Sequence, residues 1–175
     1  IRGKMNCSFG DISTTSFFPA KPLGCYGDGG AVFTDDDDLA ALLRSLRIHG
    51  KGADKYDNIR IGLNSRLDTM QAAILSVKLS AFADYELRDV NTAAQKYNEQ
   101  FEDKLRGLLG SKIKLPQVKE GYVSSWAQYT IILEDKSTRD GLQAYLKDRG
   151  IPAMIYYIKP MHAQGAFDGV KTVYT

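Results

Sequence analysis

Short apolar stretches alternate with turn-forming residues over the first part of the chain. Residues 6–18 and 30–34 are rich in β-branched and aromatic residues and are bounded by Gly, Pro and Asp, which predicts a strand, a loop and a second strand. Residues 34–50 then have helical spacing. Thr34 and the aspartates after it suit the positive end of a helix dipole, and Gly50 is placed to end the helix.

A longer helical pattern follows a polar stretch, residues 51–64, that predicts a long loop. From Ser65 to about Leu109, apolar residues recur near i, i+3 or i+4 spacing, and no proline interrupts them. The apolar positions are Leu67, Met70, Ile74, Val77, Phe82, Val90, Tyr97, Phe101 and Leu105. We expect one long helix, or two stacked helices, that bridges two domains.

The pattern near the end of the chain predicts a small α/β domain. Residues 124–135 alternate like a strand, and residues 151–158 predict a second strand. Between them, residues 137–150 have a helical pattern that begins with Ser and Thr and ends at Gly.

Composition and charge are those of an ordinary globular protein, since 43% of the residues are hydrophobic and 25% are charged. The formal net charge is only +2 and the basic residues are spread along the chain, so we expect no surface for nucleic acid or for an anionic membrane. There is no apolar run of bilayer-spanning length and no hydrophobic signal core at the start, which favours a cytoplasmic protein. The chain begins without Met, and we expect it to be a piece of a longer protein.

The residues that most often bind metals are not spaced as a metal site. Cys7 and Cys25 lie apart, with no histidine at ligand spacing, and we expect free buried thiols. The run Asp35–Asp38 could be a metal-binding cluster or the solvated start of a helix, and its place before a helical pattern favours the helix start. We therefore expect no metal.

Lys21 is the candidate for covalent chemistry. It is the one lysine in residues 16–34, it stands between Pro19 and Pro22, and most of its neighbours are apolar or aromatic. The proline after it restricts its backbone to extended geometry. Apolar surroundings favour the neutral amine, which can attack a carbonyl or hold pyridoxal phosphate as a Schiff base. The alternative is a solvated surface lysine.

Ser16 could meet the same small cofactor as Lys21. This requires the segment between them to curl, and Pro19 is placed to turn it. A hydroxyl at the start of such a loop can hold a phosphate oxygen while the lysine reaches an aldehyde. The alternative is that Ser16 only ends a strand.

Asn64 and Arg66 form a second candidate pair. They alternate in an extended stretch and so point the same way, and the arginine fork suits phosphate. The alternative is that Asn64 or Ser65 caps the helix that follows, while Arg66 pairs with Asp68.

Four segments, in this order, resemble the DegT-type sugar aminotransferases, close to those that act on UDP-linked keto-sugars: "GDISTTSFFPAKPLGCYGDGGAVFTDD", "HGKG", "IGLNSRLDTMQAAIL" and "IYYIKPMHAQGAF". The block around Lys21 is far more specific than a lone glycine motif, and the resemblance covers nearly the whole chain. It implies an α/β fold of the aspartate-aminotransferase type (fold type I) and pyridoxal 5'-phosphate as the cofactor.

The resemblance also implies roles for single residues. The lysine of the block bonds covalently to the cofactor, which maps to Lys21, and the serine five residues before it binds the cofactor phosphate, which maps to Ser16. The asparagine of "GLNSR" reaches across a dimer interface to the phosphate in the partner's site, and the arginine approaches the nucleotide-sugar. These residues map to Asn64 and Arg66.

Two tyrosines complete the implied site. Tyr156 and Tyr157 precede the "KPMHAQ" element, and the resemblance places this aromatic pair near the nucleotide. Tyr156 stands where some relatives have histidine. His49 and His162 lie in family-like segments, and we expect structural roles for both.

We therefore expect a pyridoxal-phosphate-dependent aminotransferase. It would convert a nucleotide-linked keto-sugar, which the resemblance implies to be UDP-linked, to an amino-sugar with glutamate as the donor, for surface polysaccharide or related sugar biosynthesis. The resemblance implies a homodimer. It also places further cofactor contacts upstream of Ile1, so the isolated chain is expected not to transaminate.

The resemblance divides the chain into three parts. Residues 1–75 would belong to the large cofactor-binding domain, residues 76–110 would form the interdomain helix, and residues 111–175 would form an incomplete small C-terminal domain. Two alternatives remain. A sugar dehydratase of the same family is implied to have histidine in place of Lys21, and a non-catalytic interaction or regulatory module would keep only the dimer surface.

Overall fold

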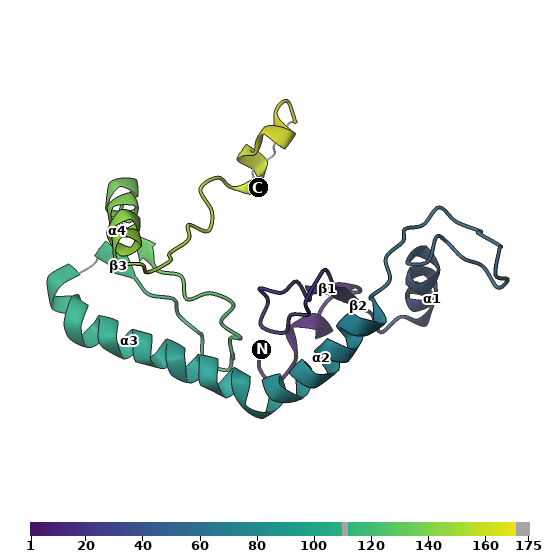
Figure 1. Cartoon of the computed structure of the whole chain (residues 1–175), viewed down its shortest axis with the longest axis horizontal. Helices are drawn as coiled ribbons and strands as arrows, with labels where there is room; N and C mark the ends of the chain where they lie inside the picture. Colours follow the sequence, from purple (N-terminus) through teal and green to yellow (C-terminus); the bar gives the residue numbers. More distant parts are fainter. Residues whose placement is uncertain (110–111, 171–175) are drawn as a thin grey trace. The chain divides into compact units, whose positions relative to one another are not determined.

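The computed structural model describes residues 1–109 and 112–170, which fall into two compact units (Figure 1). The first unit comprises Ile1–Gln100 and Gln117–Tyr129, and the second comprises Phe101–Pro116 and the chain from Thr130 onward. The strands and longer helices are β1 (Ser13–Ser16), β2 (Gly30–Phe33), α1 (Asp37–Leu46), α2 (Thr69–Ala81), η2 (Phe82–Glu86), α3 (Leu87–Leu109), β3 (Ile113–Lys114), β4 (Ile132–Leu133) and α4 (Lys136–Asp148). Among the described residues, 3-10 turns include η1 (Asn6–Ser8), η4 (Met161–Ala163) and η5 (Gly165–Phe167).

An antiparallel hairpin opens the first unit. Strand β1 pairs with β2 in a register that sets Ser13 opposite Phe33 and Ser16 opposite Gly30. The predicted strand, loop and strand are confirmed, although the first strand is shorter than expected because its early residues form the turn η1. The long connection between the two strands holds Lys21, so both ends of that connection are fixed by the hairpin.

Helix α1 follows the hairpin and begins as the sequence predicted. The side chain of Asp36 accepts a hydrogen bond from the backbone N–H of Leu39 at 2.9 Å, which satisfies one of the free donors at the helix start. After the helix, the N–H of Gly50 donates to the carbonyl of Ser45 at 2.9 Å, and Gly50 has a φ of +72°. Glycine adopts this left-handed conformation without strain.

Helices α2 and α3 follow one another without a break, as the uninterrupted apolar spacing predicted. The five-residue turn η2 between them is π-helical, and the path changes direction there (Figure 1). A π-helical turn is a recognised cause of helix bending, and such turns are frequent at functional sites. Leu75 of α2 and Ala94 of α3 are buried and belong to the apolar core of the first unit.

The described part of the second unit contains the end of α3, a short antiparallel pair and helix α4. Strands β3 and β4 pair Ile113 with Leu133 and Lys114 with Ile132. Helix α4 begins after Asp135, whose side chain accepts a hydrogen bond from the N–H of Thr138 at 2.9 Å. The predicted helix is therefore confirmed.

Two strand predictions in this part of the sequence are wrong. Of residues 124–135, only Ile132–Leu133 form a strand, because the carbonyl of Ser124 and the indole of Trp126 bind Asn91 of helix α3 instead of a neighbouring strand. Residues 151–158 form no strand with any described residue. An extended apolar segment needs a paired backbone to become part of a sheet, and none of the described segments pairs with it.

Many apolar side chains on helix α2 stay accessible to solvent. Met70 and Val77, which lie on one face of the helix, are 75% and 73% exposed. Exposed apolar side chains on one face of a helix are often found at a surface that contacts another polypeptide. Within the described residues, no helix is both long enough and apolar enough to cross a membrane. The division of the chain into domains at residues 1–75, 76–110 and 111–175 stays a prediction.

Candidate active site

Lys21 lies in a tight turn within the connection between β1 and β2. The backbone N–H of Lys21 donates to the carbonyl of Phe18 at 2.8 Å, which closes a four-residue turn with Pro19 at its second position. Proline suits that position because its φ is already fixed near the value that the turn requires. The curl that the sequence required between Ser16 and Lys21 is therefore present.

Backbone bonds fix both sides of the Lys21 turn. The N–H of Cys25 donates to the carbonyl of Phe17 at 2.8 Å, and the N–H of Phe17 donates to Gly29 at 2.8 Å. The Cys25 side chain is completely buried, and its Sγ lies 3.0 Å from the Phe17 carbonyl oxygen. A Cβ on Gly24 would lie 2.6 Å from the carbonyl oxygen of Phe18, so only glycine fits there without a shift of the backbone.

Helix α2 holds the glycine-rich end of the same loop. The side-chain Oε1 of Gln71 accepts a hydrogen bond from the backbone N–H of Tyr26 at 2.8 Å. The sequence interpretation did not select Gln71, because a polar residue inside a helical pattern gives no signal that it binds a distant loop. Gln71 thus attaches the Lys21 loop to the helix that follows Asn64 and Arg66 in the chain.

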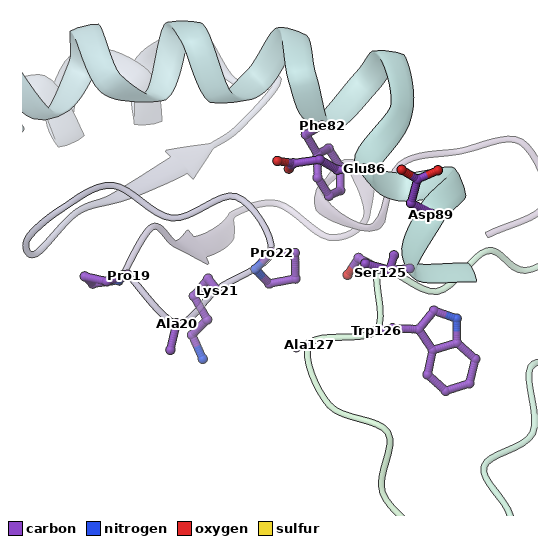
Figure 2. A pocket seen from close by; sticks show the side chains of 11 residues that line it. Pro19, Ala20, Lys21, Pro22, Phe82, Glu86, Asp89, Ser125, Trp126 and Ala127 are labelled. Carbon is purple, nitrogen blue, oxygen red and sulfur yellow. The ribbon is translucent and has the colours of Figure 1, made fainter. Parts of the chain in front are cut away.

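Lys21 lines a pocket of about 400 Å³ inside the first unit. Its walls are the Lys21 turn, the helical segment around η2, and the stretch Ser125–Ala127 (Figure 2). The lysine side chain is exposed, so the apolar neighbours expected from the sequence do not bury it. It has no ion pair with any described residue. A primary amine at the rim of a pocket is sterically free to react with a carbonyl compound.

Two carboxylates line the same pocket. Glu86 is half-buried at the end of η2, and Asp89 is exposed on the first turn of α3, where its Oδ1 accepts from Nε of Arg88 at 3.2 Å. In Figure 2 the carboxylate of Glu86 lies on the helix side of the pocket, and the Lys21 side chain extends from the opposite side of its turn. The sequence interpretation missed both carboxylates, since acidic residues on a helix are usually solvated.

Ser16 is exposed at the end of β1, just before the Lys21 turn. Its Oγ accepts a hydrogen bond from the N–H of Phe18 at 3.2 Å, and its O–H remains able to donate to a ligand. The curled segment has a primary amine at one end and a hydroxyl donor at the other. An aldehyde that carries a phosphate requires these two groups. Lys21 and Ser16 therefore fit pyridoxal phosphate in chemical type.

Asn64 and Arg66 are in direct contact. Nε of Arg66 donates to Oδ1 of Asn64 at 3.1 Å, which confirms that the two side chains point the same way. Asn64 pairs with Ile48 in an isolated antiparallel bridge, as expected of an extended segment, and the N–H of Ser65 donates to the carbonyl of Arg47 at 2.9 Å. Asp68, and neither Asn64 nor Ser65, occupies the capping position of α2. Neither Asn64 nor Arg66 lines the pocket beside Lys21.

Tyr156 and Tyr157 belong to the second unit, whereas Lys21 belongs to the first. Their ring centroids lie 5.1 Å apart with the rings almost perpendicular, and their exposed fractions are 48% and 78%. His162 lies in the turn η4 of the same unit. His49, in the first unit, has a φ of +60°, and its backbone N–H donates to Leu63 at 2.9 Å, which is a structural contact.

Comparison with known proteins assigns the chain. Residues 1–174 match the model of the DegT/DnrJ/EryC1/StrS aminotransferase family. The chain belongs to this family. It is 42% identical over 166 residues to the UDP-2-acetamido-2-deoxy-3-oxo-D-glucuronate aminotransferase of Pseudomonas aeruginosa, a match that covers 94% of this chain and 43% of that protein.

Two solved structures of family members resemble the chain closely. A DegT/DnrJ/EryC1/StrS aminotransferase from Brucella abortus is 50% identical with a TM-score of 0.84, and the match covers 95% of this chain and 42% of that one. DesV from S. venezuelae, solved in complex with a ketimine intermediate, is 35% identical with a TM-score of 0.85, and the match covers 98% of this chain and 43% of that one.

The family assignment confirms the predicted fold class. The chain has the α/β fold of aspartate-aminotransferase type (fold type I), as its structural neighbours do. It spans less than half the length of the relatives that it matches.

Proposed function

We propose that the full-length protein containing this chain is a pyridoxal-phosphate-dependent aminotransferase that converts a UDP-linked keto-sugar to the corresponding amino-sugar, with glutamate as the amino donor. The observation that supports this most directly is the position of Lys21, whose amine stands on a hydrogen-bonded turn at the rim of a pocket. The Pseudomonas aeruginosa relative is named for the same reaction class on a UDP-linked 3-oxo sugar.

Bound pyridoxal phosphate would supply an electron sink and a carrier for the amino group. Lys21 would hold the cofactor covalently before the reaction, and as a released amine it would then move a proton between donor and cofactor carbons. The O–H of Ser16 would donate to a phosphate oxygen. The hydrogen bonds that close the Lys21 turn would keep the amine in place through these steps.

The remaining residues would bind the substrate and the partner subunit. Arg66 would hold the sugar diphosphate, and its contact with Asn64 would orient both side chains. Asn64 would reach the cofactor phosphate in the partner's site, which requires at least a dimer. The exposed apolar face of α2, which includes Met70 and Val77, supports such assembly. Tyr156 and Tyr157 would lie beside the nucleotide.

Lys21 also separates this function from its two alternatives. The dehydratases of the family are implied to have histidine at this position, and a non-catalytic module would have no need for a reactive amine on a fixed turn. We place the reaction in the cytoplasm, as a step in the synthesis of surface polysaccharide or a related sugar.

A coupled assay tests the proposal. The full-length protein with pyridoxal phosphate, glutamate and a UDP-linked 3-keto-sugar should yield 2-oxoglutarate and a UDP-amino-sugar. Lys21→Ala should abolish both products. Lys4→Ala, which removes an exposed lysine near the start of the chain, should not change either rate. Equal turnover by Lys21→Ala, or loss of water from the sugar in place of amination, would contradict the proposal.

A further inference from the structure

Asn91 of helix α3 binds the pocket wall opposite the Lys21 turn. Nδ2 of Asn91 donates to the carbonyl of Ser124 at 3.0 Å and to the carbonyl of Leu87, in its own helix, at 2.7 Å. Oδ1 of the same amide accepts from the indole N–H of Trp126 at 3.1 Å. Asn91 therefore uses both ends of its amide to join a loop that is 33 residues away in sequence to the helix.

Aromatic stacking extends this attachment. The Trp126 and Tyr129 rings stack with centroids 5.6 Å apart, and Tyr129 stacks on Tyr97 of α3 at 4.9 Å. The hydroxyl of Tyr129 donates to Oδ1 of Asn98, also on α3, at 2.5 Å. Burial first, and then repulsion from Tyr97, raises the pKa of Tyr129 above its ordinary value, which favours the neutral hydroxyl that donates this bond.

The backbone at Trp126 is in a conformation that needs such support. Its φ of +46° lies in the left-handed region, where a residue with a bulky side chain is an outlier. Strained residues of this kind persist only when several contacts hold them, and they cluster around ligand sites. The N–H of Trp126 donates to Oγ of Ser124 at 3.1 Å, and Asn91 and Tyr129 hold the ring.

This strained turn determines which groups the pocket presents. Ser125, Trp126 and Ala127 line the pocket, and in Figure 2 the indole of Trp126 extends away from the Lys21 turn while Ser125 lies on the side that faces Pro22. The other polar groups of the wall are the carboxylates of Glu86 and Asp89. Carboxylates repel phosphate and accept hydrogen bonds from hydroxyl groups, so this wall suits an uncharged, hydroxyl-rich ring.

We propose that Asn91 is a positioning residue, which holds Ser124–Ala127 so that this wall of the pocket binds the sugar ring of the substrate. This inference rests on the proposed function, because it assumes that the ring is presented beside Lys21. It assigns no contact between Asn91 and the substrate, since both ends of its amide already have partners.

The test compares Asn91→Leu, Trp126→Phe and a control, Gln95→Leu, in the full-length protein. Asn91→Leu removes all three bonds at nearly constant volume, and Trp126→Phe removes the indole donor together with part of the ring that stacks on Tyr129. Gln95 is an exposed amide one turn further along the same helix, bonded to Glu99 at 2.9 Å. The first readout is the Kd for UDP-N-acetylglucosamine, measured by titration calorimetry.

We expect Asn91→Leu to weaken binding about tenfold and Trp126→Phe to weaken it by a smaller factor, since each hydrogen bond lost between the wall and helix α3 leaves the wall less fixed in the shape that binds the ring. Gln95→Leu should bind as the natural protein does. The second readout is the rate of the half-reaction with glutamate, which should stay within about twofold in all variants because no sugar takes part.

Unchanged sugar affinity in both Asn91→Leu and Trp126→Phe would overturn the inference. So would an equal loss of the glutamate half-reaction, which would indicate general unfolding of the site. If Asn91→Leu does not fold, two other variants replace it in the same measurement of the Kd for UDP-N-acetylglucosamine. These are Trp126→Phe and Asn91→Asp, the second of which keeps the acceptor for the indole. Failure of the proposed function would differ from all of these results, because the natural protein would then lack covalent cofactor on Lys21.

Discussion

Nε of Arg66 donates a hydrogen bond to Oδ1 of Asn64 over 3.1 Å, and both side chains are exposed on the extended segment before α2. The contact leaves the amide N–H groups of Asn64 and most of the arginine fork able to bind other oxygen atoms. Neither residue faces the pocket of its own Lys21. This arrangement is the one expected if Asn64 serves the neighbouring subunit.

A mixing experiment tests that assignment. Asn64→Ala and Lys21→Ala should each be inactive, but hybrid dimers of the two should contain one site with both natural residues. Statistical reassortment of subunits should then restore up to about one quarter of the natural activity. A mixture of Asn64→Ala with Asn64→Ala,Lys21→Ala is the control and should remain inactive. Absence of recovery in verified hybrids, or full activity of a monomer in sedimentation, would contradict the cross-subunit role.

Gly24 should be required for the shape of the Lys21 turn. Alanine there would place its Cβ 2.6 Å from the carbonyl of Phe18 and 2.8 Å from the carbonyl of Pro19, and both contacts are to backbone that forms the turn. We expect Gly24→Ala to destabilise the protein by about 1–3 kcal/mol and to slow covalent attachment of the cofactor.

Gly141 provides the matched control for this change. It lies within α4, and a Cβ built on it meets nothing within 4 Å. Gly141→Ala should be neutral or stabilise the helix by up to about 1 kcal/mol. For both variants, thermal unfolding measures the stability, and the rate at which the cofactor absorbance appears measures the attachment of the cofactor. Equal effects of the two substitutions would show that the Lys21 turn tolerates a side chain at Gly24.

Asp135 should make the start of α4 sensitive to acid. A hydrogen bond from the hydroxyl of Ser137, followed by bonds from the N–H and hydroxyl of Thr138, holds the pKa of Asp135 well below its ordinary value. Because the pKa of Asp135 is lower in the folded state than in the unfolded chain, its charged carboxylate stabilises the fold. This stabilisation is complete above the pKa of the unfolded chain, about 3.9, and is lost progressively as the pH falls below that value.

Thermal unfolding of Asp135→Ala and Asp135→Asn across this range measures the effect. The Tm difference between the natural protein and Asp135→Ala should be largest near neutral pH and should shrink below about pH 4. Asp135→Asn keeps an uncharged cap, so its difference from Asp135→Ala should not vary with pH. A Tm difference between the natural protein and Asp135→Ala that is constant down to strong acid would contradict the role of this carboxylate.

The sequence predicted the helices well because their signals are local. The acidic residues before α1, the apolar spacing through α2 and α3, and the Ser and Thr at the start of α4 act within one or two turns of helix. The Lys21 turn was predictable for the same reason, since Pro19 specifies it directly. The strand predictions that failed depended on partners elsewhere in the chain.

The rest of the site depends on distant contacts that periodicity does not encode. Residues 124–135 alternate like a strand, yet Asn91 binds Ser124 and Trp126 across more than thirty residues of sequence. Gln71 and Glu86 likewise appeared as ordinary polar positions on a helix. Their proximity to the Lys21 loop follows from how helix and loop pack, and that packing can be read only from the fold.

The most direct test of the account is to locate the covalent cofactor. The full-length protein should be incubated with pyridoxal phosphate, reduced with borohydride, digested and analysed by mass spectrometry. We expect the added mass on the peptide that contains Lys21, and none on the corresponding peptide of Lys21→Ala, because Lys21 is the amine that a fixed turn presents at the pocket. Stoichiometric reduction onto a different lysine, with Lys21→Ala still labelled, would contradict the central claim.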